Sequence, residues 1–510
     1  MLDLGRTFLQ SLERRPQQLA IVDGGVRLSY AQWFERIRAV CAALTGLGLA
    51  PGEHLAVVLQ NRWEMATLHW ACQLLGVIVT PLNWRAKADE LEYCVTDAEA
   101  RAVVFEAVSA EAVAGSAACR SIARIAVGGA QGGTHAFNQF LEGAPPPQLP
   151  RAGAEDCSLM LYTSGTTGRP KGVPRRHRAE RAAALAHVAQ NQYAVGEVTL
   201  GVMPLYHTMG VRSLLAMALV DGTFVCLPRF DTGEALRLIQ AEKVTNLYLV
   251  PTLYHDLLAH PGFGETDVSS VKRIGFAGAP MNDALLQRLA EAFRPQLFVN
   301  HYGSSEVYTF SIDQNAPAKP GSAGRAGFNT RIRVVKLDAG SEPSTPAALA
   351  APGEEGQIIA DLSGDEAFEG YWKRPDANAK SLRDGWYFTG DTGYLDADGD
   401  LYVTGRVDDM MICGGENISP VDIESVLSFH PAVDEVVVAG MPDERWGQKV
   451  VAFVKAKGPV NAQALDDYCR ASTLPNYKRP REYVFVKAVP KSPVGKILRR
   501  KLVAGEYDKA

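Results

Sequence analysis

The chain has 510 residues and a formal net charge of −5, from 52 Lys and Arg against 57 Asp and Glu. One hydrophobic core rarely supports such a length, so two or more domains are expected. A content of 47% hydrophobic and 21% charged residues is typical of a folded globular protein and unlike that of a disordered one. The mildly acidic balance gives no global reason to bind nucleic acid or an anionic membrane, so any anion site must be local.

Eight cysteines are scattered along the chain without a C-x-x-C pair or a neighbouring histidine cluster. This spacing argues against a zinc site and a disulfide framework, and it favours a reducing cytoplasm. The start of the chain carries acids and has no long apolar stretch, so neither a signal peptide nor a transit peptide is expected. The longest apolar runs, residues 74–79 and 214–220, are far too short to span a membrane. We therefore expect a soluble protein.

Strand-like and helix-like segments alternate in the first part of the chain. Residues 29–47 carry a Ser-x-x-Gln capping box and then apolar residues at spacings of three and four, which predicts an amphipathic helix. Apolar runs at 55–59 and 77–82 flank a second helical stretch around 64–75. The alternation predicts an α/β fold of mostly parallel sheets with covering helices. Further short apolar runs in the same pattern occupy residues 101–105, 223–227, 246–250 and 272–276.

Gly and Pro become frequent from residue 317 to 356, between short runs of strand-forming residues. This change predicts a smaller all-β subdomain, with an irregular loop at residues 339–352. Turn residues then alternate with strand formers before a charged break at residues 406–409. We place the domain boundary in this break, which divides the chain into residues 1–407 and residues 408–510.

The segment after this break has the pattern of a small α+β domain. Ser419 is expected to cap a helix that has Pro420 at its first position and runs to about Leu427. Strands are expected at residues 435–439 and 450–456. About 100 residues are enough for such a domain.

The most informative segment is LYTSGTTGRPKG at residues 161–172, where an apolar run ends in Thr, Ser and Gly residues before a Pro-Lys pair. Small residues let the backbone approach an anion closely, and the N–H groups and hydroxyls could surround phosphate oxygens. Lys171 would neutralise the charge that develops on a leaving pyrophosphate. The order differs from the G-x-x-x-x-G-K-[ST] loop of ordinary kinases and ATPases. On composition alone, a flexible surface loop explains the segment equally well.

This segment and six others in the same order resemble the adenylate-forming superfamily of acyl-CoA synthetases, adenylation domains of peptide synthetases, and luciferases. The resemblance covers nearly the whole chain. It implies an N-terminal AMP-binding domain followed by a mobile C-terminal domain. It also implies that ATP and a carboxylate form an acyl-adenylate with release of pyrophosphate, before the acyl group passes to a thiol. The other segments are MPLYHTMG (203–210), GFAGAPM (275–281), NHYGSSE (300–306), GWYFTGDTG (385–393), GRVDDMMICGGENISPVDIE (405–424) and PKSPVGKILRRKL (490–502).

The resemblance assigns a nucleotide site to these segments. Tyr302 would stack on the adenine, Asp391 would accept both ribose hydroxyls, and Arg406 would be a second ribose contact. Glu306 would be the magnesium ligand, after Ser305, where the superfamily usually has Thr. The alternatives for Asp391 and Arg406 are an Asp-Gly turn and a hinge salt bridge. The other ATP and AMP contacts would be Thr163, Ser164, Gly165, Thr166, Thr167, Gly168 and Lys171 around the triphosphate, Gly278, Ala279 and Pro280 beside the adenine, and Gly303 and Ser304.

The C-terminal segments would supply the groups of two alternating arrangements. Lys496 matches the mobile lysine that bridges the attacking carboxylate and the α-phosphate, where its charge stabilises the transition state. Without the resemblance, a lysine in this basic tail would be a solvated charge. Asp408 matches the hinge, and Gly414 and Gly415 would line a pantetheine tunnel, because side chains there would block a narrow thiol. Residues expected near the coenzyme A nucleotide are Trp446, Tyr477 and Arg479, for which packing or a partner surface is the alternative.

An acyl pocket is expected around the MPLYHTMG segment. His207 matches the family's aromatic or histidine gate, although a lone histidine in an apolar stretch is more often a core residue. Bulky Tyr308 predicts a short pocket, so we expect a small aromatic, heteroaromatic or alicyclic acid, as in the similar benzoate and halobenzoate ligases. The alternatives are a medium- or long-chain fatty acyl-CoA synthetase, an enzyme that loads a carrier protein, a luciferase and a non-catalytic relative. The pocket residues would be His207, Thr208, Met209, Val250, Ala277, Val307 and Tyr308.

One basic run departs from the family pattern. Residues 175–178 are Arg-Arg-His-Arg, where the family more often has apolar or small residues. One interpretation is a solvated helix start, and the other is a local site for coenzyme phosphates or an acidic substrate. For the whole protein we expect a small carboxylate, ATP, Mg²⁺ and coenzyme A as ligands, no nucleic acid, no membrane span, and a homodimer.

Overall fold

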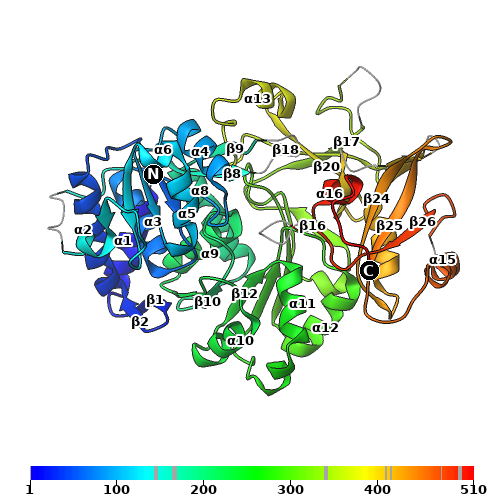
Figure 1. Cartoon of the computed structure of the whole chain (residues 1–510), viewed down its shortest axis with the longest axis horizontal. Coiled ribbons are helices and arrows are strands. Elements are labelled where there is room, and N and C mark those ends of the chain that lie inside the picture. Colours follow the sequence, from blue (N-terminus) through cyan, green and yellow to red (C-terminus); the bar gives the residue numbers. More distant parts are fainter. Residues whose placement is uncertain are drawn as a thin grey trace.

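The computed structural model of the chain describes residues 2–142, 148–163, 169–337, 343–407, 411–413, 416–472, 474–491 and 497–510. The described strands form three sheets. The N-terminal segments, in blue and cyan, lie at one end of the molecule, and the C-terminal sheet, in orange, lies at the other (Figure 1). Among the described residues, no helix is long and apolar enough to cross a membrane.

The first sheet has seven strands in the order β7-β6-β5-β3-β4-β8-β9. Neighbours pair in parallel except β8 and β9, which form an antiparallel hairpin at the edge. The runs predicted at 55–59, 77–82 and 101–105 are all strands of this sheet. Its strands are β3 (His54–Val58), β4 (Ile78–Pro81), β5 (Ala102–Phe105), β6 (Ala123–Ala126), β7 (His135–Ala136), β8 (Cys157–Thr163) and β9 (Lys171–Arg176).

The second sheet has fourteen strands and combines two kinds of pairing. Its parallel part continues without a break into antiparallel strands, because β14 pairs with β15 in the opposite direction. The expected β subdomain is therefore an extension of the parallel sheet along its edge. The parallel part contains β1 (Leu19–Asp23), β10 (Val198–Gly201), β11 (Thr223–Cys226), β12 (Asn246–Leu249), β13 (Arg273–Phe276) and β14 (Leu297–Tyr302), with β2 (Val26–Ser29) as an antiparallel edge; the extension contains β15 (Ser311–Asp313), β16 (Ser322–Ala326), β17 (Ile332–Val335), β18 (Gly356–Asp361), β19 (Leu382–Arg383), β20 (Trp386–Leu395) and β21 (Leu401–Arg406).

Helices connect the strands of both sheets. The helix predicted after the capping box is α2, whose N-cap Ser29 accepts from the backbone of Gln32 while the Gln32 side chain accepts from the backbone of Ser29. The helices before the C-terminal sheet are α1 (Leu4–Arg14), α2 (Tyr30–Gly46), α3 (Trp63–Leu75), α4 (Ala88–Asp97), α5 (Ala110–Gly115), α6 (Ala117–Arg120), α7 (Phe137–Phe140), α8 (His177–Gln190), α9 (Thr208–Leu219), α10 (Thr232–Ala241), α11 (Pro251–Ala259), α12 (Asp283–Phe293) and α13 (Pro375–Ser381), with short 3₁₀ turns at Ala107–Ser109, Pro261–Glu265 and Ala316–Ala318.

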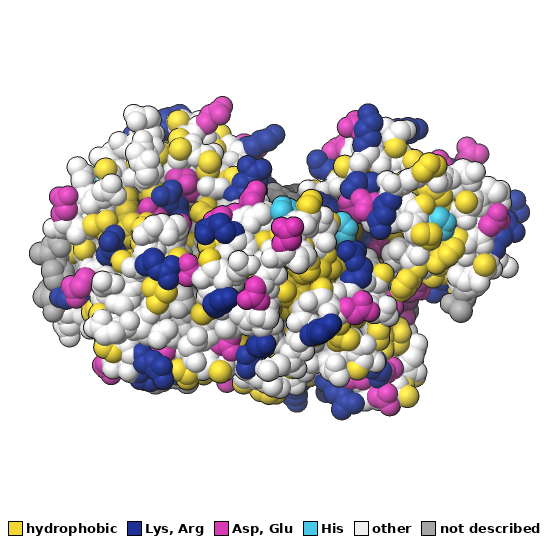
Figure 2. Space-filling model, turned by 90° about the horizontal axis from the view of Figure 1, so that it is seen from below, with side chains coloured by type: hydrophobic (Ala, Val, Ile, Leu, Met, Phe, Trp, Pro, Cys, Tyr) yellow, Lys and Arg dark blue, Asp and Glu magenta, His cyan; other side chains and the backbone are white. Residues whose placement is uncertain are grey.

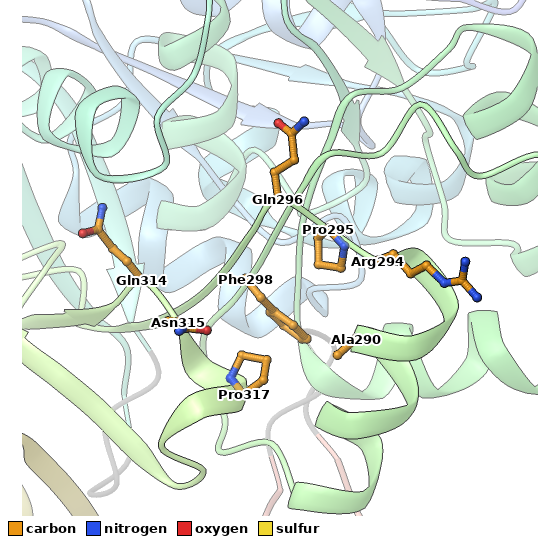
Figure 3. A pocket seen from close by; sticks show the side chains of 8 residues that line it. All are labelled: Ala290, Arg294, Pro295, Gln296, Phe298, Gln314, Asn315 and Pro317. Atoms are coloured by element: carbon orange, nitrogen blue, oxygen red, sulfur yellow. The ribbon is translucent and has the colours of Figure 1, made fainter.

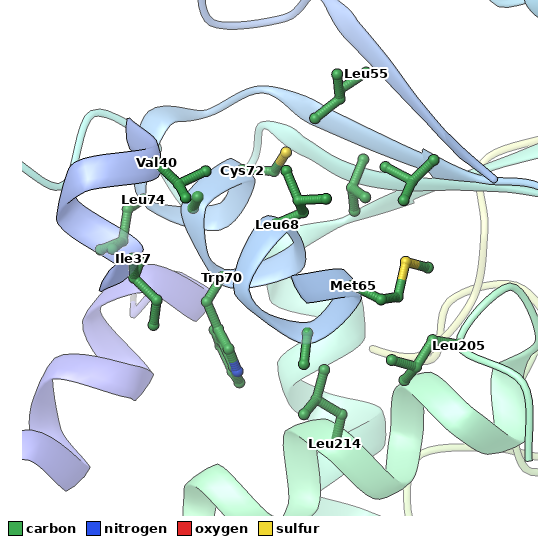
Figure 4. Packing of buried hydrophobic residues seen from close by; sticks show 14 of the residues in the cluster. Ile37, Val40, Leu55, Met65, Leu68, Trp70, Cys72, Leu74, Leu205 and Leu214 are labelled. Carbon is green, nitrogen blue, oxygen red and sulfur yellow. The ribbon is translucent and has the colours of Figure 1, made fainter. Parts of the chain in front are cut away.

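The largest core cluster joins the two sheets through a layer of helices. Every residue of α3 is buried, which is the pattern of a helix enclosed on all sides. Trp70 of α3 packs against Phe8 with ring centres 5.0 Å apart. The cluster includes Leu55 of the first sheet and Phe224 of the second, so this layer fixes the two sheets relative to each other. Figure 4 shows Trp70 among apolar side chains from the neighbouring helices.

The third sheet is built after residue 410 and has its own core. Ser419 caps α14 by accepting from the backbone of Val421 at 3.3 Å, and Pro420 is the first helical residue, as predicted. The predicted α/β class, with its β extension and a small α+β C-terminal part, is confirmed. The elements are β22 (Met411–Cys413), β23 (Glu416–Ile418), α14 (Pro420–Ser428), β24 (Val433–Asp443), β25 (Gly447–Ala456), α15 (Ala462–Ala471), β26 (Glu482–Phe485) and α16 (Arg499–Val503).

The eight cysteines are all free thiols, and all except Cys157 are buried. Burial raises the pKa of Cys41 to about 12, so that thiol stays protonated at neutral pH. Lys and Arg side chains lie among Asp and Glu side chains across the face shown in Figure 2. Positive and negative side chains are thus intermixed on this face.

Candidate active site

The edge hairpin of the first sheet positions Lys171. Thr163 at the end of β8 pairs with Lys171 at the start of β9, so both residues lie at the tip of the hairpin. Gly172 follows, and a Cβ at this position would lie 2.8 Å from the Met160 sulfur and 3.1 Å from the Trp372 Cβ, so a larger residue would require these side chains to shift. Ser164, Gly165, Thr166, Thr167 and Gly168 lie outside the described residues, so their predicted phosphate contacts stay predictions.

Lys171, Tyr371 and Glu306 form one group in the structure. The Lys171 ammonium lies 3.9 Å from the centre of the Tyr371 ring. The Tyr371 hydroxyl donates to Glu306 Oε1 at 2.7 Å. Burial lowers the pKa of Lys171, while the Glu306 carboxylate acts in the opposite direction. Burial and Glu306 both raise the pKa of Tyr371, which keeps its phenol protonated as a donor.

The Glu306 carboxylate fits the role of a magnesium ligand. It is only 6% exposed, and its backbone carbonyl accepts from Arg175 Nη1 at 2.9 Å and from Phe368 N at 2.9 Å, which holds the residue in place. Mg²⁺ in nucleotide enzymes typically takes one or two carboxylates and completes its shell with phosphate oxygens and water. A single buried carboxylate next to a cation and a phenol donor matches this pattern, and the magnesium contact of Glu306 stays a prediction.

A second acidic group lies in the turn between β20 and β21. Asp396, Asp398 and Asp400 have carboxylate oxygens within 4.8 Å of one another. Lys319 already pairs with all three, at 2.6, 3.0 and 2.5 Å. These bonds lower the pKa of Asp396 and Asp400. The lysine thus compensates the charge that a metal ion would otherwise balance.

Three predicted nucleotide residues come together from three strands. The Tyr302 hydroxyl of β14 donates to Asp391 Oδ2 of β20 at 2.6 Å. Arg406 of β21 pairs with Asp391 Oδ1 at 3.1 Å, and the two residues are opposite each other in the strand register. Burial and Asp391 raise the pKa of Tyr302. A Cβ on Gly390 would lie 3.0 Å from Arg406 Nη2, so glycine also leaves room for this ion pair.

The turn after β14 orients Glu306. A Cβ on Gly303 would lie 2.0 Å from the Tyr308 carbonyl oxygen, so the turn can close only with glycine there. The Ser304 hydroxyl accepts from the backbone of Glu306 at 3.2 Å and of Val307 at 3.4 Å. Ser305 is buried beside Glu306. The NHYGSSE segment therefore contains the end of β14 and a tight turn, which links the Tyr302 group to the Glu306 group.

The predicted acyl-pocket residues separate into two groups. His207 is the N-cap of α9, and its Nδ1 accepts from the backbone of Met209 at 3.3 Å, with Thr208 between them. Met209, Val250 and Ala277 belong to one buried cluster. A Cβ on Gly278 would lie 3.3 Å from Val250 Cγ1 and 3.9 Å from the Met209 sulfur. Ala279 and exposed Pro280 continue this loop toward solvent.

Val307 and Tyr308 belong to hydrophobic clusters other than that of Met209. Val307 lies in a cluster with Val173 and Phe310, and its place in an acyl pocket stays a prediction. Tyr308 is 2% exposed and donates to Glu180 Oε2 at 3.0 Å. Its ring lies between two guanidinium groups, at 4.2 Å from Arg175 and 5.1 Å from Arg212.

The basic run at residues 175–178 is engaged in ion pairs and burial. Arg175 is fully buried and pairs with Glu180 at 2.7 Å. His177 is buried, its Nδ1 accepts from the backbone of Leu4, and burial lowers its pKa to about 4. Arg176 and Arg178 both pair with Glu369. A solvated helix start therefore does not describe this run, which instead anchors the junction of β9 and α8.

The residues expected near coenzyme A have different environments. Trp446 is 39% exposed, and the Arg445 guanidinium carbon lies 4.8 Å from its ring. Tyr477 is 45% exposed. Arg479 is held by Asp466 at 2.7 Å. Four other predicted site residues, Lys496, Asp408, Gly414 and Gly415, lie outside the described residues.

An open hollow on the second sheet is separate from these groups. It has a volume of about 440 Å³ and lies beside α12 (Figure 3). Phe298 of β14 lines it, whereas Val299 and His301 point to the other face, because successive residues of a strand alternate. The lining residues are Ala290, Arg294, Pro295, Gln296, Phe298, Gln314, Asn315 and Pro317.

Comparison with known families decides how these groups are interpreted. Residues 8–372 match the model of the AMP-binding enzyme family, and residues 422–496 match that of the AMP-binding enzyme C-terminal domain. The chain belongs to the AMP-binding enzyme family. This confirms the predicted superfamily, the fold class and the enzyme class, an AMP-forming acid–thiol ligase that uses ATP, Mg²⁺ and coenzyme A.

Curated relatives and solved structures agree over nearly the full chain. The chain is 33% identical to a 4-chlorobenzoate–CoA ligase of Arthrobacter sp. over 504 residues, which cover 96% of this chain and 93% of the relative. It is 30% identical to a long-chain fatty acid CoA ligase of Mycobacterium tuberculosis over 506 residues, 98% of this chain and 97% of the relative. The structure of o-succinylbenzoate CoA synthetase from Bacillus subtilis with its acyl-adenylate intermediate has a TM-score of 0.84 and 28% identity, and it covers 97% of both chains.

Two features of this AMP-binding enzyme are absent from the sequence-based predictions. Tyr371 lies between Lys171 and Glu306, and its signal is only a Gly-Tyr-Trp triplet in a loop. Arg212 is buried in α9, where a single arginine interrupts the otherwise apolar TMGVRSLLAMAL. A charged residue on such a helix is a signal that could have been used.

Proposed function

We propose that this protein is an AMP-forming acyl-CoA ligase for a small aromatic, heteroaromatic or alicyclic carboxylate. ATP and the acid would give acyl-AMP and pyrophosphate, and coenzyme A would then give the thioester and AMP. The observation that carries this proposal is that the group of Tyr302, Asp391 and Arg406 lies next to the group of Lys171, Tyr371 and Glu306. Tyr387 lies between them, because its hydroxyl is 3.3 Å from that of Tyr371, and burial together with the charges of Glu306 and Asp391 raises its pKa.

In the first step the chain would bind ATP by its ribose and its phosphates. Asp391 would accept from the two ribose hydroxyls, for which a carboxylate is a suited partner, and Arg406 would support it. Lys171 would neutralise charge on the departing pyrophosphate. Mg²⁺, held by Glu306, would supply charge neutralisation at the phosphates. Lys496 would bring a second cation to the attacking carboxylate and the α-phosphate.

In the second step the C-terminal domain would rotate. We place the boundary between residues 407 and 408, with Asp408 as the hinge. Gly414 and Gly415 would then form the pantetheine tunnel. The exposed rings of Trp446 and Tyr477 support a coenzyme A surface on this domain, because large exposed aromatic side chains are typical of binding surfaces. Arg479 would assist through its charge.

Two finer properties complete the proposal. A cytoplasmic location is supported by eight free cysteines, seven of them buried, since such thiols persist in a reducing compartment. A homodimer is retained as an expectation because closed twofold dimers are the commonest oligomers.

The test is an activity panel. The purified protein is incubated with ATP, Mg²⁺ and aryl, alicyclic or fatty acids, with and without coenzyme A, and AMP, pyrophosphate and thioester are quantified. AMP formation that needs both coenzyme A and a small ring acid supports the proposal. The identity to a long-chain fatty acid CoA ligase makes fatty acids the second candidate. Preference for chains beyond about ten carbons would overturn the small-acid assignment, and acyl transfer only to a carrier protein would overturn the coenzyme A assignment.

A further inference from the structure

Arg175 connects a buried ion pair to the turn that carries Glu306. It is the residue before the last of β9, and its side chain is fully buried. Its Nε donates to Glu180 Oε1 at 2.7 Å, and its Nη1 donates to the Glu306 backbone carbonyl at 2.9 Å. A planar guanidinium holds its donors in a fixed fork, so the position of one partner sets the direction of the bond to the other.

The carboxylate that orients Arg175 is itself fixed. Glu180 is buried in the first turn of α8. Its second oxygen accepts from the Tyr308 hydroxyl at 3.0 Å, and the Tyr308 ring lies 4.2 Å from the Arg175 guanidinium. These three side chains therefore contact one another in a closed triangle. Tyr308 also ends the tight turn of residues 303–308, here called the Glu306 turn.

The Glu306 turn is thus held at two points by this triangle. Arg175 bonds the backbone carbonyl of Glu306, and Glu180 bonds the side chain of Tyr308, two residues later. The bonds that the Ser304 hydroxyl accepts within the turn are longer, at 3.2 and 3.4 Å. The Arg175 bond is shorter and charge-assisted, so it is the stronger restraint on the backbone.

The position of this backbone determines where the Glu306 carboxylate lies. One carboxylate oxygen accepts from the Tyr371 hydroxyl at 2.7 Å, and the carbonyl of the same residue accepts from Arg175. Mg²⁺ requires nearly ideal octahedral geometry, with ligand distances of about 2.1 Å. Because the carboxylate moves with the backbone that carries it, a less restrained turn would hold a magnesium ligand poorly.

The burial of the Arg175–Glu180 pair favours a role beyond stability. A buried ion pair is weak evidence for stability, because apolar residues of similar volume often stabilise a protein as well or better. Both side chains are 0% exposed. Arg175 also begins the run that departs from the family pattern. A fully buried pair that directs one donor at the Glu306 carbonyl is therefore better explained by the restraint that it places on the Glu306 turn.

We propose that Arg175 is a positioning residue for the magnesium site and acts through the backbone carbonyl of Glu306. This inference rests on the proposed function, because the magnesium contact of Glu306 is part of the proposed mechanism. Glu180 orients the guanidinium, the guanidinium holds the Glu306 turn, and the turn keeps the carboxylate where Mg²⁺ and the ATP phosphates would meet it. Arg175 bonds the Glu306 carbonyl and not its carboxylate, so its loss should change the dependence on magnesium.

The main test is the double variant Arg175→Met/Glu180→Leu. Removing both charges should return much of the stability that Arg175→Met loses, but the Glu306 carbonyl keeps only its bond from the backbone of Phe368. The magnesium concentration for half-maximal pyrophosphate release should rise by about 10-fold, the effect of one hydrogen bond from a charged group. Urea titrations give the stability of the same preparations. A rate that falls at every magnesium concentration with an unchanged half-saturation would assign a structural role and overturn the inference.

Arg175→Lys tests the fork while keeping a cation beside Glu180. A single ammonium does not reproduce the two directions that Nε and Nη1 serve, so a smaller rise in the magnesium half-saturation is expected with little change in stability. If the double variant does not fold, this variant decides the question. Wild-type magnesium dependence in Arg175→Lys would then overturn the inference.

Arg273→Met is the matched control for loss of an ion pair. Arg273 pairs with Glu197 at 2.7 Å and lies opposite Leu297 at the start of β14, whereas the Glu306 turn follows the end of that strand. The control should lose stability and keep the wild-type magnesium dependence. A rise equal to that of the double variant would assign the effect to general destabilisation and overturn the inference.

A mutant cycle tests whether Arg175 acts through Glu306. Glu306→Gln removes the charge that would bind the metal and keeps the carbonyl that Arg175 bonds. In this background, Arg175→Met/Glu180→Leu should change the magnesium half-saturation by less than about twofold, because residues that act through one group are not additive. A further rise of about 10-fold would place the effect of Arg175 on another group and overturn the inference.

A binding measurement separates this inference from the proposed function. The affinity for ATP is measured by calorimetry with and without Mg²⁺, in the absence of any acid. The double variant should lose about 10-fold in affinity when Mg²⁺ is present and keep the wild-type affinity for ATP alone. If this difference is found while no acid supports AMP formation, the proposed substrate class falls and the positioning role stands. If acids are activated but neither binding nor rate depends on Arg175, the ligase assignment stands and the inference falls.

Discussion

The Tyr371 hydroxyl donates to Glu306 at 2.7 Å while the Tyr371 ring lies 3.9 Å from the Lys171 ammonium. One aromatic side chain thus positions both the expected magnesium ligand and the expected phosphate cation. Tyr371 is 65 residues from Glu306 in the chain. Its two interactions can be separated by mutation, because the ring and the hydroxyl serve different partners.

Tyr371→Phe removes the hydroxyl and keeps the ring. We expect kcat/KM for ATP to fall by about 10-fold, the value of one hydrogen bond to a charged group, and the magnesium concentration for half-maximal rate to rise. Tyr371→Ala should lose more, because the cation–π contact with Lys171 is also removed. Initial rates of pyrophosphate release across a magnesium series measure both effects. Tyr394→Phe, on the β20 strand and stacked on Tyr402, is the control that should leave the magnesium dependence unchanged.

Asp391→Asn should impair ATP binding. The substitution removes the charge that pairs with Arg406 and the carboxylate that Tyr302 donates to. We expect the KM for ATP to rise by about 10- to 100-fold with a smaller effect on the acid. Asp398→Asn, in the Lys319 cluster, is the matched control. An unchanged KM for ATP in Asp391→Asn would contradict the ribose assignment.

The pH profile of kcat/KM should report Lys171. Burial lowers the pKa of Lys171 from its usual value near 10.5, and the cation is the active form. Activity is therefore present below this lowered pKa and is lost as the pH rises through it, so the alkaline limb begins earlier than for an exposed lysine. Lys171→Arg should move the limb to higher pH, because a guanidinium remains protonated. Pyrophosphate release at pH 7 to 11 measures the limb, and an identical limb in Lys171→Arg would assign it to another group.

Removing one partner of the buried Arg175–Glu180 ion pair should destabilise the protein, because the remaining charge would be buried without compensation. Arg175→Met leaves the Glu180 charge buried without its cation, so we expect the free energy of unfolding to fall by about 3–5 kcal/mol. The double variant Arg175→Met/Glu180→Leu should recover much of this loss. Urea titrations followed by circular dichroism measure both values. A double variant no more stable than Arg175→Met would show that the carboxylate is not the source of the loss.

Lys496→Ala should separate the two half-reactions. The positioned cation is needed where two anions meet, so adenylate formation should be abolished. Thioester formation from a chemically prepared acyl-adenylate should survive, because the proposed mechanism uses Lys496 only in adenylate formation. Arg500→Ala in the same basic tail is the control. Unchanged pyrophosphate release in Lys496→Ala would remove this residue from the mechanism.

Local sequence patterns were sufficient to predict the family and many of the helices and strands. The seven segments are identifiable because each needs particular small, polar or charged residues close together in the chain, and the capping residues Ser29 and Ser419 act within three positions of themselves. The family resemblance of these segments implies nucleotide contacts for Tyr302, Asp391 and Arg406. The structure brings these three into contact.

Tertiary structure alone decided the environment of the charged residues. The charge of residues 175–178 predicts that they are exposed, yet Arg175 is buried. Packing brings Glu180 and the Glu306 carbonyl into contact with its guanidinium. Arg212 lies in an apolar helical segment of the sequence, and only the packing of β12, β14 and α9 shows that it is buried against the Tyr248 hydroxyl and His301. Whether a charge is solvated, paired or left for a ligand depends on contacts between distant segments, and local residue order does not encode these directly.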